Sequence, residues 1–112
     1  MGGRSGLGEF EQLVLLAVVR LGAGAFGPDI ATELEASVGR GVTRGALYST
    51  LNRLEEKALL RWEAAGPGAD RGGHIRRRFS VTPEGLQALR DRRAALLTMW
   101  DGIEGVLDGG SS

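Results

Sequence analysis

Hydrophobic residues in the first third of the chain recur at helical spacing. Between residues 9 and 21 they stand three or four positions apart, at Phe10, Leu13, Val14, Leu16, Ala17 and Leu21. This spacing predicts an amphipathic helix, which Gly22 and Gly24 would end. A second helix of roughly ten residues is predicted in AFGPDIATELEAS, where a proline stands at the expected first helical position and Ile30 and Leu34 repeat at four.

The segment TRGALYSTLNRLEEKALL predicts a third helix, which follows Gly39 and Gly41 and has Thr43 as its N-cap. Its buried stripe has 4-3-4 spacing and consists of Leu47, Leu51, Leu54 and Ala58. The face opposite this stripe is polar and small, and carries Gly45, Ser49, Asn52 and Glu56, with Arg44, Tyr48 and Arg53 on its flanks. The outer face of the first two turns is therefore suited to hydrogen bonding.

After Ala58 the period of the pattern changes from helical spacing to two. Leu60 and Trp62 alternate with polar residues, as do Phe79 and Val81, and the Gly/Pro-rich sequence GPGADRGG lies between the two runs. Two short strands that form a hairpin are predicted. Three helices followed by a hairpin are the layout of a winged helix-turn-helix, in which the third helix is the recognition helix and the hairpin is the wing.

A fourth helix is predicted from residue 83 to 107, with Thr82 as N-cap and Pro83 at its first position. Its apolar residues follow three- and four-residue spacing, interrupted by an arginine, and a helix this long cannot bury them against its own small domain. We therefore expect a symmetric homodimer, while the contribution of the first helix stays open. The expected interface residues are Leu86, Leu89, Arg93, Leu96, Leu97, Trp100, Ile103 and Leu107.

The expected fold class is mainly α with a small β-hairpin. Residues 9–82 would form the winged helix-turn-helix domain and residues 83–107 the C-terminal dimerisation helix. Residues 1–8 are expected to be a flexible leader and residues 108–112 a flexible tail, neither of which carries the fold. A chain of 112 residues is long enough for one modest core.

Composition excludes several kinds of chemistry. The chain has no cysteine and a single histidine, so disulfides, thiol catalysis and Cys-based zinc sites are excluded, and no nucleophile–base pair can be proposed. We expect a protein that is not an enzyme and that has no metal and no cofactor. No apolar run is long enough to span a membrane, and the N-terminus has no apolar stretch typical of a secretory signal, so a cytoplasmic location is expected.

Charge is distributed unevenly along a chain that is neutral as a whole, with 14 basic and 14 acidic residues. Residues 40–78 hold nine basic and four acidic residues, a balance of +5, so the remainder of the chain sums to −5. Such local positive charge attracts a polyanion. Double-stranded DNA is accordingly the expected partner.

The expected DNA-binding residues lie on the third helix and the wing: Arg44, Gly45, Tyr48, Ser49, Asn52, Arg53, Arg71, His74, Arg76 and Arg78. Asn52 and Arg53 are candidates for base edges, since Asn pairs with adenine and Arg with guanine. Arg44, near a helix N-terminus, is better placed for phosphate. Gly45 costs about 1 kcal/mol in a helix relative to Ala, and either close approach of DNA or tight packing inside the domain would justify it.

The arginines at residues 76 to 78 have two interpretations. They would contact phosphate from the wing, or form a solvated edge that prevents strands of different molecules from pairing. Strand alternation places Arg77 on the face of Phe79, where it would extend over the core or pair with a carboxylate, while Arg76 and Arg78 face away.

Four segments together, FEQLVLLAVVRLG, FGPDIATEL, GALYSTLNRLEEKALL and RGGHIRRRFSVTPEGLQAL, resemble the PadR-like transcriptional regulators over about residues 8 to 107. The resemblance implies a winged helix, a dimerising C-terminal helix and sequence-specific DNA binding, usually as a repressor. Where relatives usually have a tyrosine before the second helix, this chain has Phe26. Its C-terminal part is expected to be a single helix, as in the short members of the family. Some members respond to flat aromatic compounds, so the resemblance makes Trp100 a candidate effector contact beside its role as a structural anchor.

The sequence thus favours a homodimeric repressor that binds a roughly palindromic operator, with its two recognition helices about 34 to 36 Å apart. The alternative is a winged-helix protein-interaction module that dimerises but does not bind DNA. The uneven charge favours the first, because protein interfaces are not usually so lopsided in charge.

Overall fold

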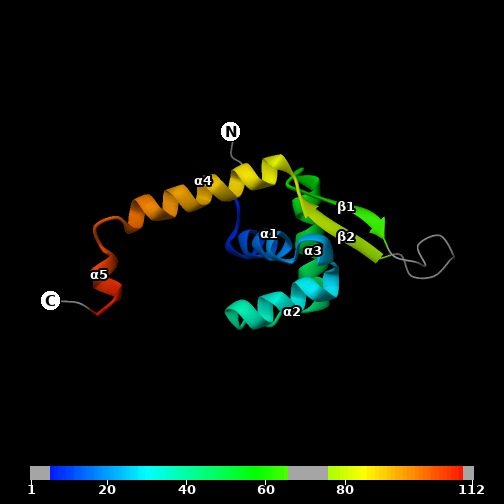
Figure 1. The fold of residues 1–112 in the computed structure, drawn as a ribbon, viewed down its shortest axis with the longest axis horizontal. Coiled ribbons are helices and arrows are strands. Elements are labelled where there is room, and N and C mark those ends of the chain that lie inside the picture. Colours follow the sequence, from blue (N-terminus) through cyan, green and yellow to red (C-terminus); the bar gives the residue numbers. More distant parts are fainter. Residues whose placement is uncertain (1–5, 66–75, 110–112) are drawn as a thin grey trace.

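The computed structural model describes residues 6–65 and 76–109. In chain order the elements are α1 (Glu9–Leu21), the 3₁₀ turn η2 (Gly22–Gly24), α2 (Gly27–Val38), α3 (Arg44–Glu56), β1 (Leu60–Ala65), β2 (Arg76–Val81), α4 (Pro83–Trp100) and α5 (Glu104–Leu107) (Figure 1). The expected fold class is confirmed: the chain is mainly helical with one antiparallel hairpin and a C-terminal helix.

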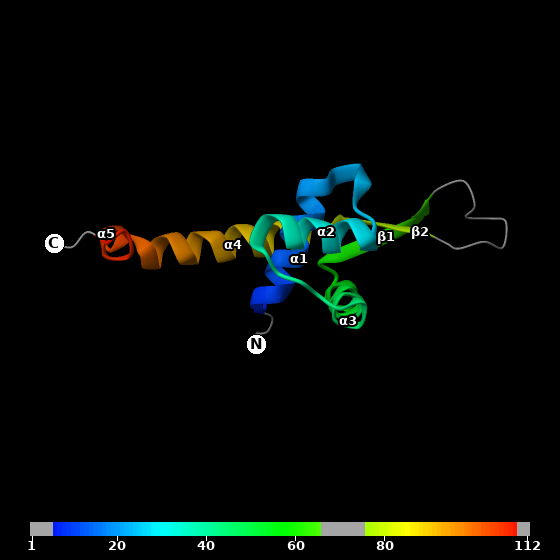
Figure 2. The same ribbon diagram turned by 90° about the horizontal axis from the view of Figure 1, so that it is seen from below.

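The core is centred on α1, which contacts α2, α3, β2 and α4. Its periodic apolar face buries Val14, Leu15, Ala17 and Val18. The other large side chains that are fully buried come from α2, α3 and β1 and are Ile30, Leu47, Leu51, Leu54 and Leu60. Figure 2 shows α3 projecting to one side of the layer formed by the other elements, with the hairpin extending to one end and α4 to the other.

Helix α3 begins where the sequence predicts, because the Thr43 hydroxyl accepts a hydrogen bond from the Ala46 N–H at 3.1 Å. Leu47, Leu51 and Leu54 form its buried stripe. The assignment of Ala58 to this stripe is wrong. The helix ends at Glu56, and Ala58 is exposed in a left-handed conformation with φ 63°, which turns the chain into β1.

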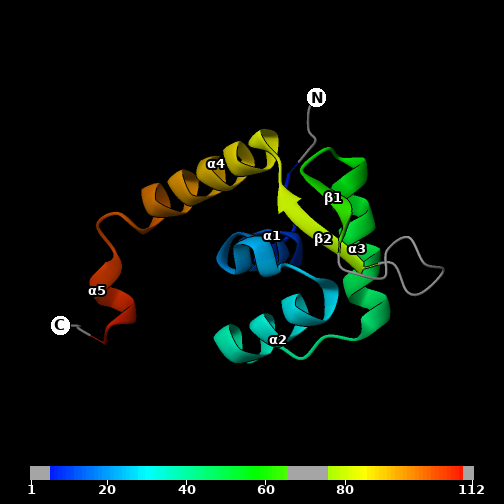
Figure 3. The ribbon, with the colours of Figure 1, turned by 45° about the vertical axis from the view of Figure 1, so that its right-hand side comes forward.

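The hairpin places Leu60 opposite Val81 and Trp62 opposite Phe79. A third extended segment, not predicted from the sequence, borders β2. Phe26 bridges Arg78, and the Phe79 N–H donates to the Ala25 carbonyl at 2.8 Å. The segment before α2 is thereby hydrogen-bonded to β2. Figure 3 shows α3 lying beside the hairpin.

Residues 6 and 7 contribute to the fold, contrary to the expectation that residues 1–8 do not; residues 1–5 lie outside the described residues. Leu7 is 6% exposed and belongs to the core. Its carbonyl accepts a hydrogen bond from the Arg92 guanidinium of α4, and the Lys57 ammonium donates to the Gly6 carbonyl at 3.4 Å. Leu7 therefore packs in the core, and its backbone is hydrogen-bonded to α4.

A glycine allows α4 to pack against the turn before β1. The Thr82 hydroxyl accepts from the Gly85 N–H at 3.0 Å and donates to the Ala58 carbonyl at 2.7 Å. A Cβ on Gly85 would stand 2.2 Å from the Leu59 carbonyl oxygen. Any side chain at this position would therefore separate the helix from the core.

The prediction of one continuous helix from residue 83 to 107 is wrong, because the structure has two helices there. Helix α4 ends at Trp100, and α5 begins at Glu104 in a different direction (Figure 1). The break lies at Gly102, whose φ of 86° is outside the helical region and favours glycine. Every residue from 93 to 109 is exposed.

Candidate nucleic-acid interface

The outward face of α3 is small and polar, as predicted. Gly45, Ser49 and Asn52 are all exposed. Within the described residues, the α3 side chains that form hydrogen bonds are Thr50 and Arg53, which leaves the amide of Asn52 and the hydroxyl of Ser49 available to a ligand. A Cβ on Gly45 would meet no atom within 4 Å, so packing among the described residues does not require this glycine.

Tyr48 joins α3 to the start of α2. Its ring is half-buried, and its hydroxyl lies where a side chain on Gly27 would be, since a Cβ there would stand 1.9 Å from the Tyr48 oxygen. The Arg44 guanidinium lies over the Tyr48 ring, 5.7 Å from the centroid. Gly27 therefore permits the close contact of α2 with α3, and Tyr48 in turn supports Arg44.

The first two arginines of β2 are stacked on aromatic rings. Arg76 lies 4.0 Å from the centroid of Phe26, and Arg77 lies 4.6 Å from the centroid of Trp62. The predicted side of Arg77 is confirmed: it extends over the Trp62 ring that packs against the core. Stacking restricts the motion of each guanidinium. Its N–H donors lie in the guanidinium plane and point away from its edge, so the ring does not cover them.

These residues line one pocket of about 450 Å³. We call it the basic pocket; its lining residues are Phe26, Gly27, Pro28, Arg44, Tyr48, Arg76 and Arg77. It brings the start of α3 and the start of β2 to one surface, although 32 positions separate Arg44 from Arg76 in the sequence. Phe26 and Arg77 were not among the predicted site residues, because strand alternation assigns Arg77 to the core side and no local pattern connects Phe26 to the wing.

Arg53, a predicted base contact, is engaged within the protein. Its Nε donates to Oε2 of Glu11 at 3.0 Å, and the Lys57 ammonium lies 3.0 Å from both oxygens of the same carboxylate. Glu11 is 6% exposed and also accepts from the Gly8 N–H at 2.8 Å. This cluster attaches α3 to α1.

Burial alone would raise the pKa of the Glu11 carboxyl. The hydrogen bonds from the Gly8 N–H, Lys57 and Arg53 outweigh that effect and hold the pKa below its ordinary value. The carboxylate is therefore charged in the folded protein and keeps both cations at this end of α3.

Arg78 is on the outer face of the hairpin, as predicted, but it is paired. Its Nη2 lies 2.5 Å from Oε2 of Glu63 on the neighbouring strand, and the hydrogen bond from Arg78 lowers the pKa of the Glu63 carboxyl. The pair is charge-balanced, so the unbalanced positive charge of β2 comes from Arg76 and Arg77. Two predicted wing contacts, Arg71 and His74, lie outside the described residues.

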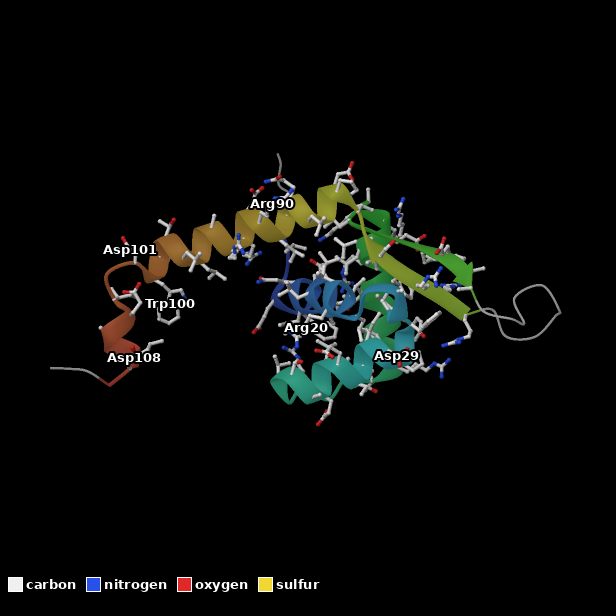
Figure 4. All side chains as sticks on the ribbon, in the orientation of Figure 1. Arg20, Asp29, Arg90, Trp100, Asp101 and Asp108 are labelled. Atoms are coloured by element: carbon white, nitrogen blue, oxygen red, sulfur yellow. The ribbon has the colours of Figure 1, made fainter. Side chains whose placement is uncertain are left out.

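The C-terminal apolar residues are presented to solvent. Leu89 is partly buried against the core, Arg93 is exposed, and the other predicted interface residues, Leu86, Leu96, Leu97, Trp100, Ile103 and Leu107, are 37 to 69% exposed. Figure 4 shows Trp100 at the end of α4 on the side of that helix where α1 and α5 lie, and Arg90 on its outer side. Leu16 and Val19 of α1 are exposed as well.

Within residues 6–65 and 76–109, no group of three or more His, Cys, Asp or Glu side chains is placed to hold a metal ion. None of the helices described is both long enough and apolar enough to cross a membrane.

Comparison with known proteins finds the same fold in solved structures of PadR-like regulators. A PadR family transcriptional regulator from Eggerthella lenta is 28% identical over 91% of this chain and 88% of its own, with a TM-score of 0.65. A PadR-like transcription factor from Bacteroides fragilis is 22% identical over 87% and 88%, with a TM-score of 0.69. A PadR-like regulator from Bacillus cereus is 19% identical over 91% and 93%, with a TM-score of 0.67.

No protein-family model matches the sequence, and no curated protein does. The resemblance to PadR-like regulators is confirmed by the structural matches.

Proposed function

We propose that this chain, which resembles the PadR-like transcriptional regulators and has their fold, is a homodimeric DNA-binding repressor. The observation that carries the proposal is the basic pocket, because it joins the N-terminal end of α3 and the first residues of β2 on one surface. A recognition helix and a wing contact the same duplex only if they share a surface. The similar proteins are described as transcription factors and transcriptional regulators, which supports the same role.

In this proposal α3 enters the major groove with its outward face. The Asn52 amide pairs with an adenine edge, and Ser49 contacts a base or a phosphate. Gly45 permits the start of α3 to approach the duplex backbone, since no atom of the described residues lies within 4 Å of a Cβ at this position. Arg53 holds α3 on α1 through its ion pair with Glu11.

The dimer is proposed to form through the exposed C-terminal residues. Seven large apolar side chains between residues 96 and 107 are 37 to 74% exposed, and a soluble monomer rarely leaves so much apolar surface uncovered in one region. A two-fold axis beside α4 would display two α3 helices to a palindromic site. Trp100 would lie near that axis, where an aromatic effector would stack on it.

The test begins with fragments of the source genome selected for binding, which supplies the site sequence. Asn52→Ala should reduce the preference for that site over a scrambled duplex, because it removes a base contact. Arg76→Ala should weaken both duplexes alike. It removes one phosphate contact from each protomer, so it should flatten the salt dependence of the dimer by about two units of slope. With about eight phosphate contacts per dimer, a plot of the logarithm of the wild-type binding constant against the logarithm of the salt concentration should have a slope of about −7.

Arg90→Ala is the matched control, since it removes the same charge from the outer side of α4 (Figure 4). It should leave affinity and slope unchanged. Absence of duplex binding at low salt would contradict the proposal and favour the protein-interaction module.

A further inference from the structure

We propose that the basic pocket is a clamp for a single phosphate group, held by the guanidinium groups of Arg44, Arg76 and Arg77 beside the first turn of α2. The inference rests on the proposed function where the phosphate belongs to the backbone of bound DNA. It goes further in assigning one phosphate to three named cations from two separate elements.

The three arginines of the basic pocket are held by aromatic rings and not by a glutamate. Outside the pocket, Arg40 likewise lies over the ring of Phe10, 5.0 Å from its centroid. Arg20, Arg53, Lys57 and Arg78 each pair with a glutamate. Within residues 6–65 and 76–109, Arg44, Arg76 and Arg77 have no such partner and lie instead on the rings of Tyr48, Phe26 and Trp62. The aromatic rings hold the charges in position without neutralising them, so the N–H donors remain available to an anion.

The lining of the pocket is suited to an anion in other respects. It contains three positive side chains and no acidic one. The half-buried Tyr48 hydroxyl has no hydrogen-bond partner among the described residues, and Phe26, the N-cap of α2, provides no side-chain cap. The positive end of the α2 dipole therefore adds to the field of the guanidinium groups.

The size of the pocket indicates what carries the phosphate. A volume of about 450 Å³ far exceeds a single phosphate group, so the group would enter with its ester substituents extending out along the surface. Two sources present this chemistry: a phosphodiester of the DNA backbone, and a free phosphorylated small molecule. The position beside the exposed face of α3 suits the first, and the two sources are distinguished experimentally.

The first arm of the test uses the selected duplex with a neutral methylphosphonate placed at one backbone position at a time. Wild-type protein should lose about tenfold in affinity at one position per half-site. Arg76→Gln should bind the natural duplex about tenfold more weakly than wild type. A methylphosphonate at the sensitive position should not reduce the affinity of this variant further, because the charge that contacts the phosphate is already absent. Arg44→Gln, on a different element, should show the same non-additivity, whereas Arg90→Gln should behave as wild type.

The second arm measures thermal unfolding in inorganic phosphate or pyrophosphate against chloride of equal ionic strength. If the clamp serves a free ligand, these anions raise the midpoint of the wild type and of Arg90→Gln but not that of Arg76→Gln, and no single backbone position is sensitive. Duplex binding with neither a sensitive position nor a phosphate-specific shift would overturn the clamp and leave the proposed function standing. Failure to bind duplex, together with no phosphate effect, would overturn both.

Discussion

The buried carboxylate of Glu11 offers a sharp test of how α3 is held in place. Glu11→Gln keeps the shape of the side chain and an acceptor for the Gly8 N–H, but removes the charge that faces Arg53 and Lys57. We expect the variant to fold and to be less stable than wild type at pH 7. Since the cations lie at the C-terminal end of α3, we also expect weaker binding of the selected duplex.

The magnitude follows from the contacts and from their exposure. Hydrogen bonds to a charged group contribute about 1.5–3 kcal/mol each when both groups are buried. Here the Arg53 and Lys57 side chains are 51% and 32% exposed, so water solvates them once Glu11 is neutral and most of that range must be discounted. A loss of about 2 kcal/mol in the free energy of unfolding is expected, below the 3–5 kcal/mol for breaking a fully buried pair.

The pH dependence identifies the cause. The pKa of Glu11 is lowered in the folded protein, so its contribution is complete above the unfolded value, near 4.3, and is lost as the pH falls through the folded value. The gap between wild type and Glu11→Gln should therefore be constant from pH 7 to about 5 and narrow at lower pH.

Urea unfolding followed by circular dichroism, at one protein concentration, measures this gap. Glu9→Gln is the control, because Glu9 has the same charge in the same first turn of α1 but is exposed. If Glu11→Gln were as stable as Glu9→Gln at pH 7, or if its deficit persisted unchanged in acid, the electrostatic explanation would be refuted.

Three further predictions concern packing, the α3 surface and assembly. Gly85→Ala should destabilise the fold by at least the roughly 1–3 kcal/mol typical of overpacking, measured against Gly105→Ala, where a Cβ meets nothing within 4 Å; equal stability would show that α4 shifts freely. Gly45→Ala should raise stability by up to about 1 kcal/mol and weaken duplex binding, and unchanged affinity would argue against close approach of the backbone. Ile103→Glu should sediment as a monomer, and an unchanged dimer would remove the argument for the C-terminal interface.

The elements themselves follow from local features of the sequence. Apolar spacing of three and four places α1, α2 and α3, and the hydroxyls of Thr43 and Thr82 mark two helix starts, because capping depends on residues three positions away. Alternation assigns Arg77 to the face of Phe79, and the outward face of α3 follows from helical geometry alone. Each of these inferences depends on neighbours within a few residues.

Local patterns also mislead where two of them compete. Apolar residues at helical spacing continue past Trp100, yet the Asp101–Gly102 pair ends the helix. The segment is exposed, so no packing against the other described residues keeps it helical. Ala58 fits the stripe of α3 by spacing, but the chain must turn there to enter β1.

What the tertiary structure alone decided is which distant residues meet. The pairing of Glu11 with Arg53 spans 42 positions, and the basic pocket depends on Phe26 joining the hairpin and on Gly27 admitting Tyr48. A sequence pattern specifies the side of a helix or strand on which a residue lies. The partner on that side depends on how whole elements pack, and this is why three stacked arginines emerge as a site only once the elements are assembled.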